Sequence, residues 1–185
     1  MPVLVSFLRG VNVGGSHKIK MDALRALYAS LGLRHVTTFI QSGNVVFVAP
    51  ARDVSKLAGK IEEAIEKAVG FRPDVVLRTV PELRAALDRN PFAGRDGIDP
   101  SRLLISFLSC DPDPEGTKKV LALEIAPEEL CIEGRHAYVY FPDGIARTKL
   151  SWSQLGKSLK ASVTARNLTT VQKLLLMAEQ LEASQ

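Results

Sequence analysis

The sequence predicts an α+β protein made of two packed ferredoxin-like units with antiparallel sheets, the second of them incomplete or modified. Three observations give this prediction. Strand-like and helix-like patterns follow each other as β-α-β-β-α-β over residues 1–79, which is the ferredoxin-like order. Residues 102–185 echo it as β-α-β-β-α-α. The stretch 93–101 is rich in Gly, Asp and Pro, so we expect a linker there between units at 1–92 and 102–185.

The first half contains four strand patterns and two helix patterns. In order, they are a strand at 3–8, a helix at 21–31, strands at 36–40 and 45–48, a helix at 54–68 and a strand at 75–79. The first strand is almost wholly apolar, which is typical of a strand buried on both faces. Gly32 and Gly70 end the two helices. The expected sheet is antiparallel with strand order 4-1-3-2.

The second half is predicted from similar signals. A helix follows the capping box Thr79-Val80-Pro81-Glu82, and a later helix follows Ser151-Trp152-Ser153-Gln154. The remaining expected elements are a strand at 103–108, a helix at 114–123, a hairpin of 130–133 with 137–141, and a last helix from Leu168. The two halves repeat an architecture, and we identify no sequence repetition between them.

Composition narrows the class of protein. The chain has 185 residues, of which 46% are hydrophobic and 24% charged, as in an ordinary globular protein. No apolar run is long enough to span a membrane, and Arg9 and Gly10 interrupt the apolar start, so we expect no secretory signal. Cys110 and Cys131 lie far apart and predict reduced thiols and a cytoplasmic location. The three histidines have no metal-ligand spacing, so we expect no metal and no cofactor.

Charge is distributed unevenly along the chain. Residues 1–52 carry six Lys or Arg and one carboxylate, and residues 144–178 carry six Lys or Arg and none. The segment 53–143 between them carries seventeen acidic and twelve basic residues. The net charge of +4 therefore hides two basic segments, which favour an anionic ligand.

Two polar loops are expected to meet at one edge of the first sheet. The topology places the end of the first strand, at Arg9-Gly10, beside the turn Gln41-Ser42-Gly43-Asn44. Gly10, Gly14 and Gly15 allow backbone N–H groups to point at an anion, and the helix that follows favours negative charge at its start. Arg9, Lys18 and Lys20 would supply positive charge.

Structural alternatives stay open at each of these motifs. The glycine loop matches neither GxGxxG nor GxxxxGK[ST], and it is equally explained as a tight turn in which Asn12 bonds the backbone. The Gln41–Asn44 motif is also typical of a β-hairpin turn without a ligand-binding role. Thr164 or Asn167 is typical of a helix cap, whereas Arg166, Arg147 and Lys149 need either an anionic ligand or a structural carboxylate.

Several of these sequence motifs together resemble those of a bacterial family, the domain of unknown function 1697 (DUF1697). The resemblance lies in residues 9–15, 40–45 and 164–171, and extends through Asn90-Pro91-Phe92, Pro142-Asp143-Gly144 and Lys149-Leu150. It implies two ferredoxin-like α/β units. Leu168 stands where the family usually has Trp. The family name implies no activity.

The sequence thus predicts a cytoplasmic protein that binds a phosphorylated small molecule, a nucleotide or a short nucleic acid. The alternatives are an enzyme acting on such an anion, with no assignable catalytic residue, and a self-associating module without a ligand, as a monomer or homodimer. Nucleic acid is the less favoured partner, and no membrane is expected. The candidate ligand-binding residues are Arg9, Gly10, Asn12, Gly14, Gly15, Lys18, Gln41, Ser42, Asn44, Lys149, Arg166 and Asn167.

Overall fold

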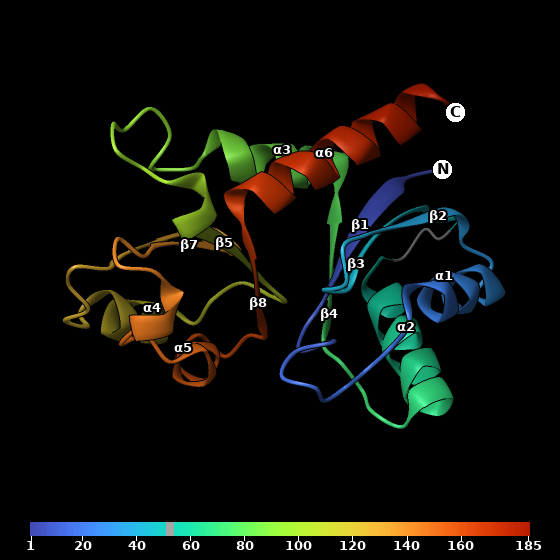
Figure 1. Ribbon diagram of the computed structural model, residues 1–185, viewed down its shortest axis with the longest axis horizontal. Helices are drawn as coiled ribbons and strands as arrows, with labels where there is room; N and C mark the ends of the chain where they lie inside the picture. Colours follow the sequence, from blue (N-terminus) through green and yellow to red (C-terminus); the bar gives the residue numbers. More distant parts are fainter. Residues whose placement is uncertain (51–53) are drawn as a thin grey trace. The chain divides into compact units, whose positions relative to one another are not determined.

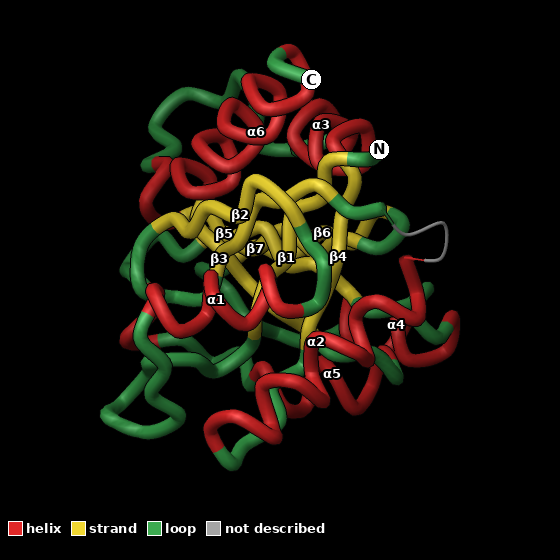
Figure 2. Tube along the Cα trace, turned by 90° about the vertical axis from the view of Figure 1, so that its right-hand side faces the viewer, coloured by secondary structure: helices red, strands yellow, loops and turns green. Residues whose placement is uncertain are grey.

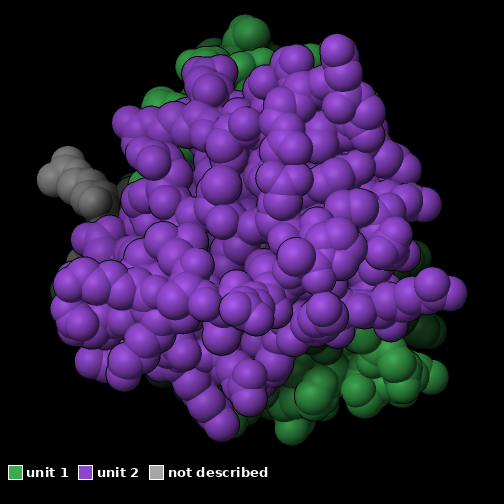
Figure 3. Space-filling model, turned by 90° about the vertical axis from the view of Figure 1, so that its left-hand side faces the viewer, with its two compact units in different colours: residues 1–84, 173–185 green, residues 85–172 purple. Residues whose placement is uncertain are grey.

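The computed structural model describes residues 1–50 and 54–185, and in these ranges it contains two four-stranded antiparallel sheets and six α-helices (Figure 1). The predicted α+β class is confirmed. Two compact units are present, residues 1–84 together with 173–185, and residues 85–172 (Figure 3). They differ from the predicted segments because the chain changes unit within two helices and not at residues 93–101.

Unit 1 holds the first sheet and the two helices that cover one face of it. Its elements are β1 (Val3–Leu8), α1 (Met21–Ser30), β2 (Arg34–Phe39), β3 (Asn44–Val48), α2 (Val54–Val69) and β4 (Val75–Thr79). The strand order is β2-β3-β1-β4, which is the expected 4-1-3-2 order in reverse. The core forms where Leu4, Leu8 and Phe47 of the sheet meet Tyr28 of α1 and Ile61 of α2, all fully buried. Helices α1 and α2 lie on the same side of this sheet (Figure 2).

Unit 2 holds the second sheet and its covering helices α4 and α5. The elements of this half are η1 (Pro100–Arg102), β5 (Leu103–Leu108), α4 (Pro114–Leu121), β6 (Glu129–Glu133), β7 (His136–Tyr140), η2 (Ile145–Arg147), α5 (Trp152–Leu159) and β8 (Val163–Asn167). Its strand order, β6-β7-β5-β8, is equivalent to that of unit 1.

Strand β8 corrects the prediction that the second half is incomplete. For residues 164–167 the sequence predicts a helix cap at Thr164 or Asn167 and a candidate ligand contact at Arg166, but no strand, because the side chains are mostly polar. They form a strand that pairs with β5, with Arg166 opposite Ile105 and Val163 opposite Leu108. The second half therefore has all six elements of the β-α-β-β-α-β order.

Helices α3 (Val80–Asp88) and α6 (Leu168–Ala183) follow the last strand of each sheet. The predicted capping box at the start of α3 is confirmed: Glu82 N–H donates to Thr79 Oγ1 at 3.3 Å, and Thr79 N–H donates to a Glu82 carboxylate oxygen at 2.8 Å. At the start of α6, Thr170 N–H donates to Asn167 Oδ1 at 2.8 Å. Arg84 of α3 forms an ion pair with Glu179 of α6 at 2.7 Å.

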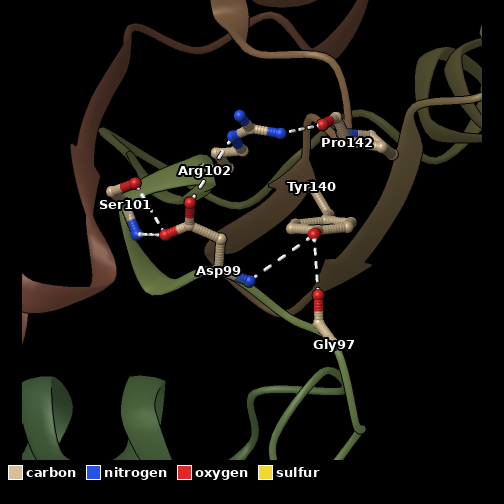
Figure 4. A network of polar contacts seen from close by, with 6 residues as sticks. All are labelled: Gly97, Asp99, Ser101, Arg102, Tyr140 and Pro142. Carbon is tan, nitrogen blue, oxygen red and sulfur yellow. Dashed lines mark hydrogen bonds and ion pairs between the residues drawn. The ribbon is translucent and has the colours of Figure 1, made fainter.

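The segment predicted as a linker is held by a polar network (Figure 4). Asp99 caps η1 by accepting from Ser101 N–H at 2.9 Å, and its carboxylate also lies 3.5 Å from Arg102 Nε. Arg102 donates to the carbonyl of Pro142. The Tyr140 hydroxyl donates to Gly97 O at 3.3 Å, so this stretch is tied to the end of β7, an inner strand of the second sheet.

The central strands of the two sheets repeat a sequence as well as a position. Strand β1 is VLVSFL and β5 is LLISFL, and each pairs with the third and fourth strand of its own sheet. Arg78 of β4 lies opposite Val5, and Arg166 of β8 lies opposite the equivalent Ile105. The two strands are identical at four of their six positions, so the architectural repeat contains one short segment of similar sequence.

The serine of this repeat has a different environment in each unit. Ser6 Oγ hydrogen-bonds Tyr28 Oη at 2.8 Å in the core of unit 1, where burial raises the pKa of Tyr28. Ser106 is equally buried, but its hydroxyl has no hydrogen-bond partner within the described ranges. A buried hydroxyl without a partner is destabilising, whereas a paired one contributes to stability.

We therefore expect opposite effects from the same substitution at the two positions. Ser6→Ala should lower the free energy of unfolding by about 1–3 kcal/mol, because it leaves the Tyr28 hydroxyl buried and unpaired. Ser106→Ala should leave stability unchanged or raise it. Urea denaturation of the two variants provides the measurement, and equal destabilisation by both would contradict the difference between the two cores.

Candidate functional site

The loop after β1 and the turn between β2 and β3 meet at one end of the first sheet, as the topology predicts. Leu8 N–H donates to Gly43 O at 2.9 Å, which joins the end of β1 to the turn. Gly43 has φ +77°, and a Cβ there would lie 2.8 Å from Leu8 Cβ. The turn can therefore approach β1 this closely only with glycine at position 43.

Asn12 fastens the glycine loop to the turn. Its Nδ2 donates to Gln41 O at 2.8 Å and to Ile19 O at 3.0 Å, and its Oδ1 accepts from Ile19 N–H at 2.9 Å. Its own N–H donates to His17 O at 3.1 Å. Asn12 has φ +56°, a left-handed conformation that asparagine tolerates better than most residues. One side chain thus closes residues 12–19 into a loop and holds it against the turn.

The glycines of this loop leave backbone donors open. Gly14 and Gly15 have φ +60° and +79°, and no atom lies within 4 Å of a Cβ built on either. Their positive φ angles favour glycine, although there is enough space around both positions for a larger side chain. Neither backbone N–H group donates a hydrogen bond to any residue in the described part of the chain. These two N–H groups are available to a ligand.

An open pocket of about 450 Å³ lies where the loop and the turn meet. It is lined by Asn12, Gly15, Lys18, Ile19, Lys20 and Gln41. Four of these six residues, Asn12, Gly15, Lys18 and Gln41, belong to the predicted candidates. Lys18 and Lys20 are exposed, and neither forms an ion pair with any residue that the structure describes. The pocket is therefore a site of uncompensated positive charge.

The start of α1 adds to this potential. Lys20 is the N-cap residue, and its side chain forms no capping hydrogen bond. The first N–H groups of this ten-residue helix thus lack a side-chain acceptor, and the helix dipole favours negative charge beside them. Asp22 in the first turn is paired with Arg25, which also donates to Thr38 Oγ1 at 2.6 Å.

Other predicted residues of unit 1 have structural partners. Arg9 forms an ion pair with Asp74 at 3.4 Å and does not line the pocket. Asn44 is buried, and its Nδ2 donates to Phe39 O at 3.1 Å and to Ser42 Oγ at 2.9 Å, which stabilises the turn from inside. Gly10 has φ +69° and provides the bend after β1.

Lys149, Arg166 and Asn167 belong to unit 2. Lys149 Nζ donates to Ala126 O at 3.0 Å, and Asn167 caps α6. Arg166 Nη1 donates to Ala165 O at 2.8 Å. The residue is half-buried, but its guanidinium lies deep enough that burial lowers its pKa to about 10. The capping interpretation is confirmed for Asn167.

The described residues contain no cluster of three or more His, Cys, Asp or Glu that could hold a metal ion. In the same part of the chain, no helix is both long and apolar enough to cross a membrane. His17 lies beside the glycine loop with its ring 4.7 Å from that of Phe71.

Comparison with known proteins gives the family. A family model described as a protein of unknown function (DUF1697) matches residues 1–138, three quarters of the chain. The chain belongs to the DUF1697 family. The DUF1697 match includes the glycine loop, the β2–β3 turn and therefore every residue that lines the pocket. No curated protein matches the chain.

A solved structure shares the fold of this DUF1697 chain. The conserved bacterial protein SP0830 from Streptococcus pneumoniae is 24% identical, with a TM-score of 0.75 over 96% of this chain and 98% of that protein. Because it covers 96% of the chain, the similarity includes residues of both units and extends beyond residue 138, where the family model ends.

The role of Asn12 as a donor can be tested with an isosteric substitution. Asn12→Asp should lower the free energy of unfolding by about 1–3 kcal/mol, because it replaces a donor with an oxygen that faces two carbonyl groups. The matched control is Asn167→Asp, where the side chain only accepts a bond at a helix start and aspartate is equally suitable. Urea denaturation should show a loss for the first variant alone. Equal stability of the two would contradict the role of Asn12.

Proposed function

We propose that this protein binds a small anionic ligand in the pocket between the glycine loop and the β2–β3 turn. The observation that carries the proposal is that two exposed lysines, Lys18 and Lys20, line one pocket together with Gly15, whose amide group is open, and that the open amide group of Gly14 directly precedes it in the loop. Neither lysine has an ion-pair partner within the ranges described. Positive charge beside free backbone N–H groups is the arrangement that binds phosphate in proteins.

The geometry favours a phosphorylated small molecule over an inorganic ion alone. A pocket of about 450 Å³ falls within the usual range for small-molecule sites. In our proposal, the phosphate group lies against Lys18, Lys20 and the glycine amides. Gln41 also lines the pocket, and its side-chain amide offers both a donor and an acceptor for a hydroxyl or base of the same ligand.

Two broader assignments accompany this proposal. We propose that each unit is a ferredoxin-like fold, supported by the β-α-β-β-α-β order and the equivalent strand orders of the two sheets. We also propose a cytoplasmic location, supported by the free thiols of Cys110 and Cys131.

The proposal predicts salt-sensitive binding that depends on two lysines. Calorimetric titration with phosphate, pyrophosphate, AMP and sugar phosphates should identify a ligand whose affinity falls as salt rises, because the main contacts are ionic. The double variant Lys18→Gln/Lys20→Gln should weaken that ligand at least tenfold, since hydrogen bonds to charged groups contribute about 1.5–3 kcal/mol each. Arg9→Gln should have a smaller effect, because Arg9 is paired with Asp74.

A matched control has the same net charge. Lys60→Gln/Lys67→Gln removes two exposed lysines from α2, outside the pocket, and should leave affinity nearly unchanged. Loss of affinity in both double variants would show that only net charge matters. That result, or no binding by any probe at low salt, would overturn the proposal.

A further inference from the structure

A second pocket, of about 350 Å³, lies in unit 2 between α4 and α5. Its lining comes from the end of α4 with the residues after it, from residues 149–151, and from α5. The two helices are in close contact at Gly116, where a Cβ would lie 1.7 Å from Ser158 O. This contact fixes the distance between the two helices that border the pocket.

The floor of this pocket is aliphatic. Val120, Leu150 and Leu155 line it and belong to the hydrophobic core of unit 2, with exposed fractions of 2%, 4% and 2%. Leu123 lines it as well and is 52% exposed. An apolar floor that reaches the surface through an exposed leucine is suited to the hydrocarbon part of a ligand.

The same pocket has a cationic rim. Lys119, Lys149 and Lys157 line it, together with a single carboxylate, Glu124, so the lining carries a net charge of +2. Lys149 is held in place, because its Nζ donates to Ala126 O at 3.0 Å and its backbone N–H to Glu128 Oε1 at 3.1 Å. None of the three lysines takes part in an ion pair among the residues described.

We infer that this pocket binds an amphipathic anion, a medium-chain alkyl carboxylate. The chain would cover Val120, Leu150 and Leu155, while the carboxylate would lie among the lysines of the rim. A purely ionic ligand would leave the exposed side chain of Leu123 in contact with water, and a neutral hydrocarbon would gain nothing from the lysines. The inference is independent of the proposed function, since it concerns other residues in the other unit.

Calorimetric titration of the intact chain with hexanoate, octanoate and decanoate tests this inference. Each added methylene that enters the pocket should tighten binding about fourfold, so octanoate should bind about fifteenfold more tightly than hexanoate. Octan-1-ol, with the same hydrocarbon and no charge, should bind at least tenfold more weakly than octanoate. Affinity that does not change with chain length, or equal binding of octanol, would overturn the inference.

Charge-matched variants locate the site. Lys119→Gln/Lys157→Gln should weaken octanoate about tenfold. Lys118→Gln/Lys160→Gln removes adjacent charges that do not line the pocket and are paired with Glu115 and Asp113, and it should retain affinity. Equal losses in the two pairs would place octanoate elsewhere and overturn the assignment. Lys18→Gln/Lys20→Gln should leave octanoate binding unchanged, which separates this outcome from that of the proposed function.

Discussion

The side-chain amide of Asn12 is the contact on which the candidate site depends. It bonds the glycine loop to itself through Ile19 and to the β2–β3 turn through Gln41 O. Without these bonds, the loop after β1 would lose its fixed position, and Lys18 and Lys20 would no longer be held in one pocket with Gln41. Because a neutral amide is both donor and acceptor, asparagine meets all three bonds at once, while a carboxylate cannot. The structural and the functional interpretation of this loop are therefore compatible. The hydrogen bonds of Asn12 that stabilise the loop also hold Lys18 and Lys20 in place.

The two units show how one architecture supports different surfaces. Their sheets have equivalent strand orders, and their central strands share a sequence. The covering helices differ, however. Unit 1 pairs Ser6 with Tyr28 of α1, whereas in unit 2 helices α4 and α5 meet at Gly116 and Ser106 has no partner in the described ranges. The pockets differ as well: that of unit 1 lies at a loop and a turn, and that of unit 2 lies between two helices.

Much of the fold could be predicted because most elements have strong periodic patterns and clear end signals. The capping box at Thr79 and the strand order of the first sheet are examples. Strand β8 was missed because polar residues with local capping roles obscure a five-residue strand. In the site, topology predicted that the loop and the turn converge. The pairing of Arg9 with Asp74 joins residues 65 positions apart, and the rim of the second pocket joins lysines from three segments. Such contacts depend on packing that no local pattern encodes.

The most direct test of the account is a titration of uniformly ¹⁵N-labelled protein with pyrophosphate, followed by the backbone amide resonances. The account predicts shifts at Gly14, Gly15, Lys18 and Gln41 that saturate together with one dissociation constant and shrink when salt is added. It also predicts little change at the opposite end of the first sheet, for example at the amides of Val3 and Val48, which pair there. Resonances of the glycine loop that stay constant while others shift, or shifts spread evenly over all basic surfaces, would contradict it.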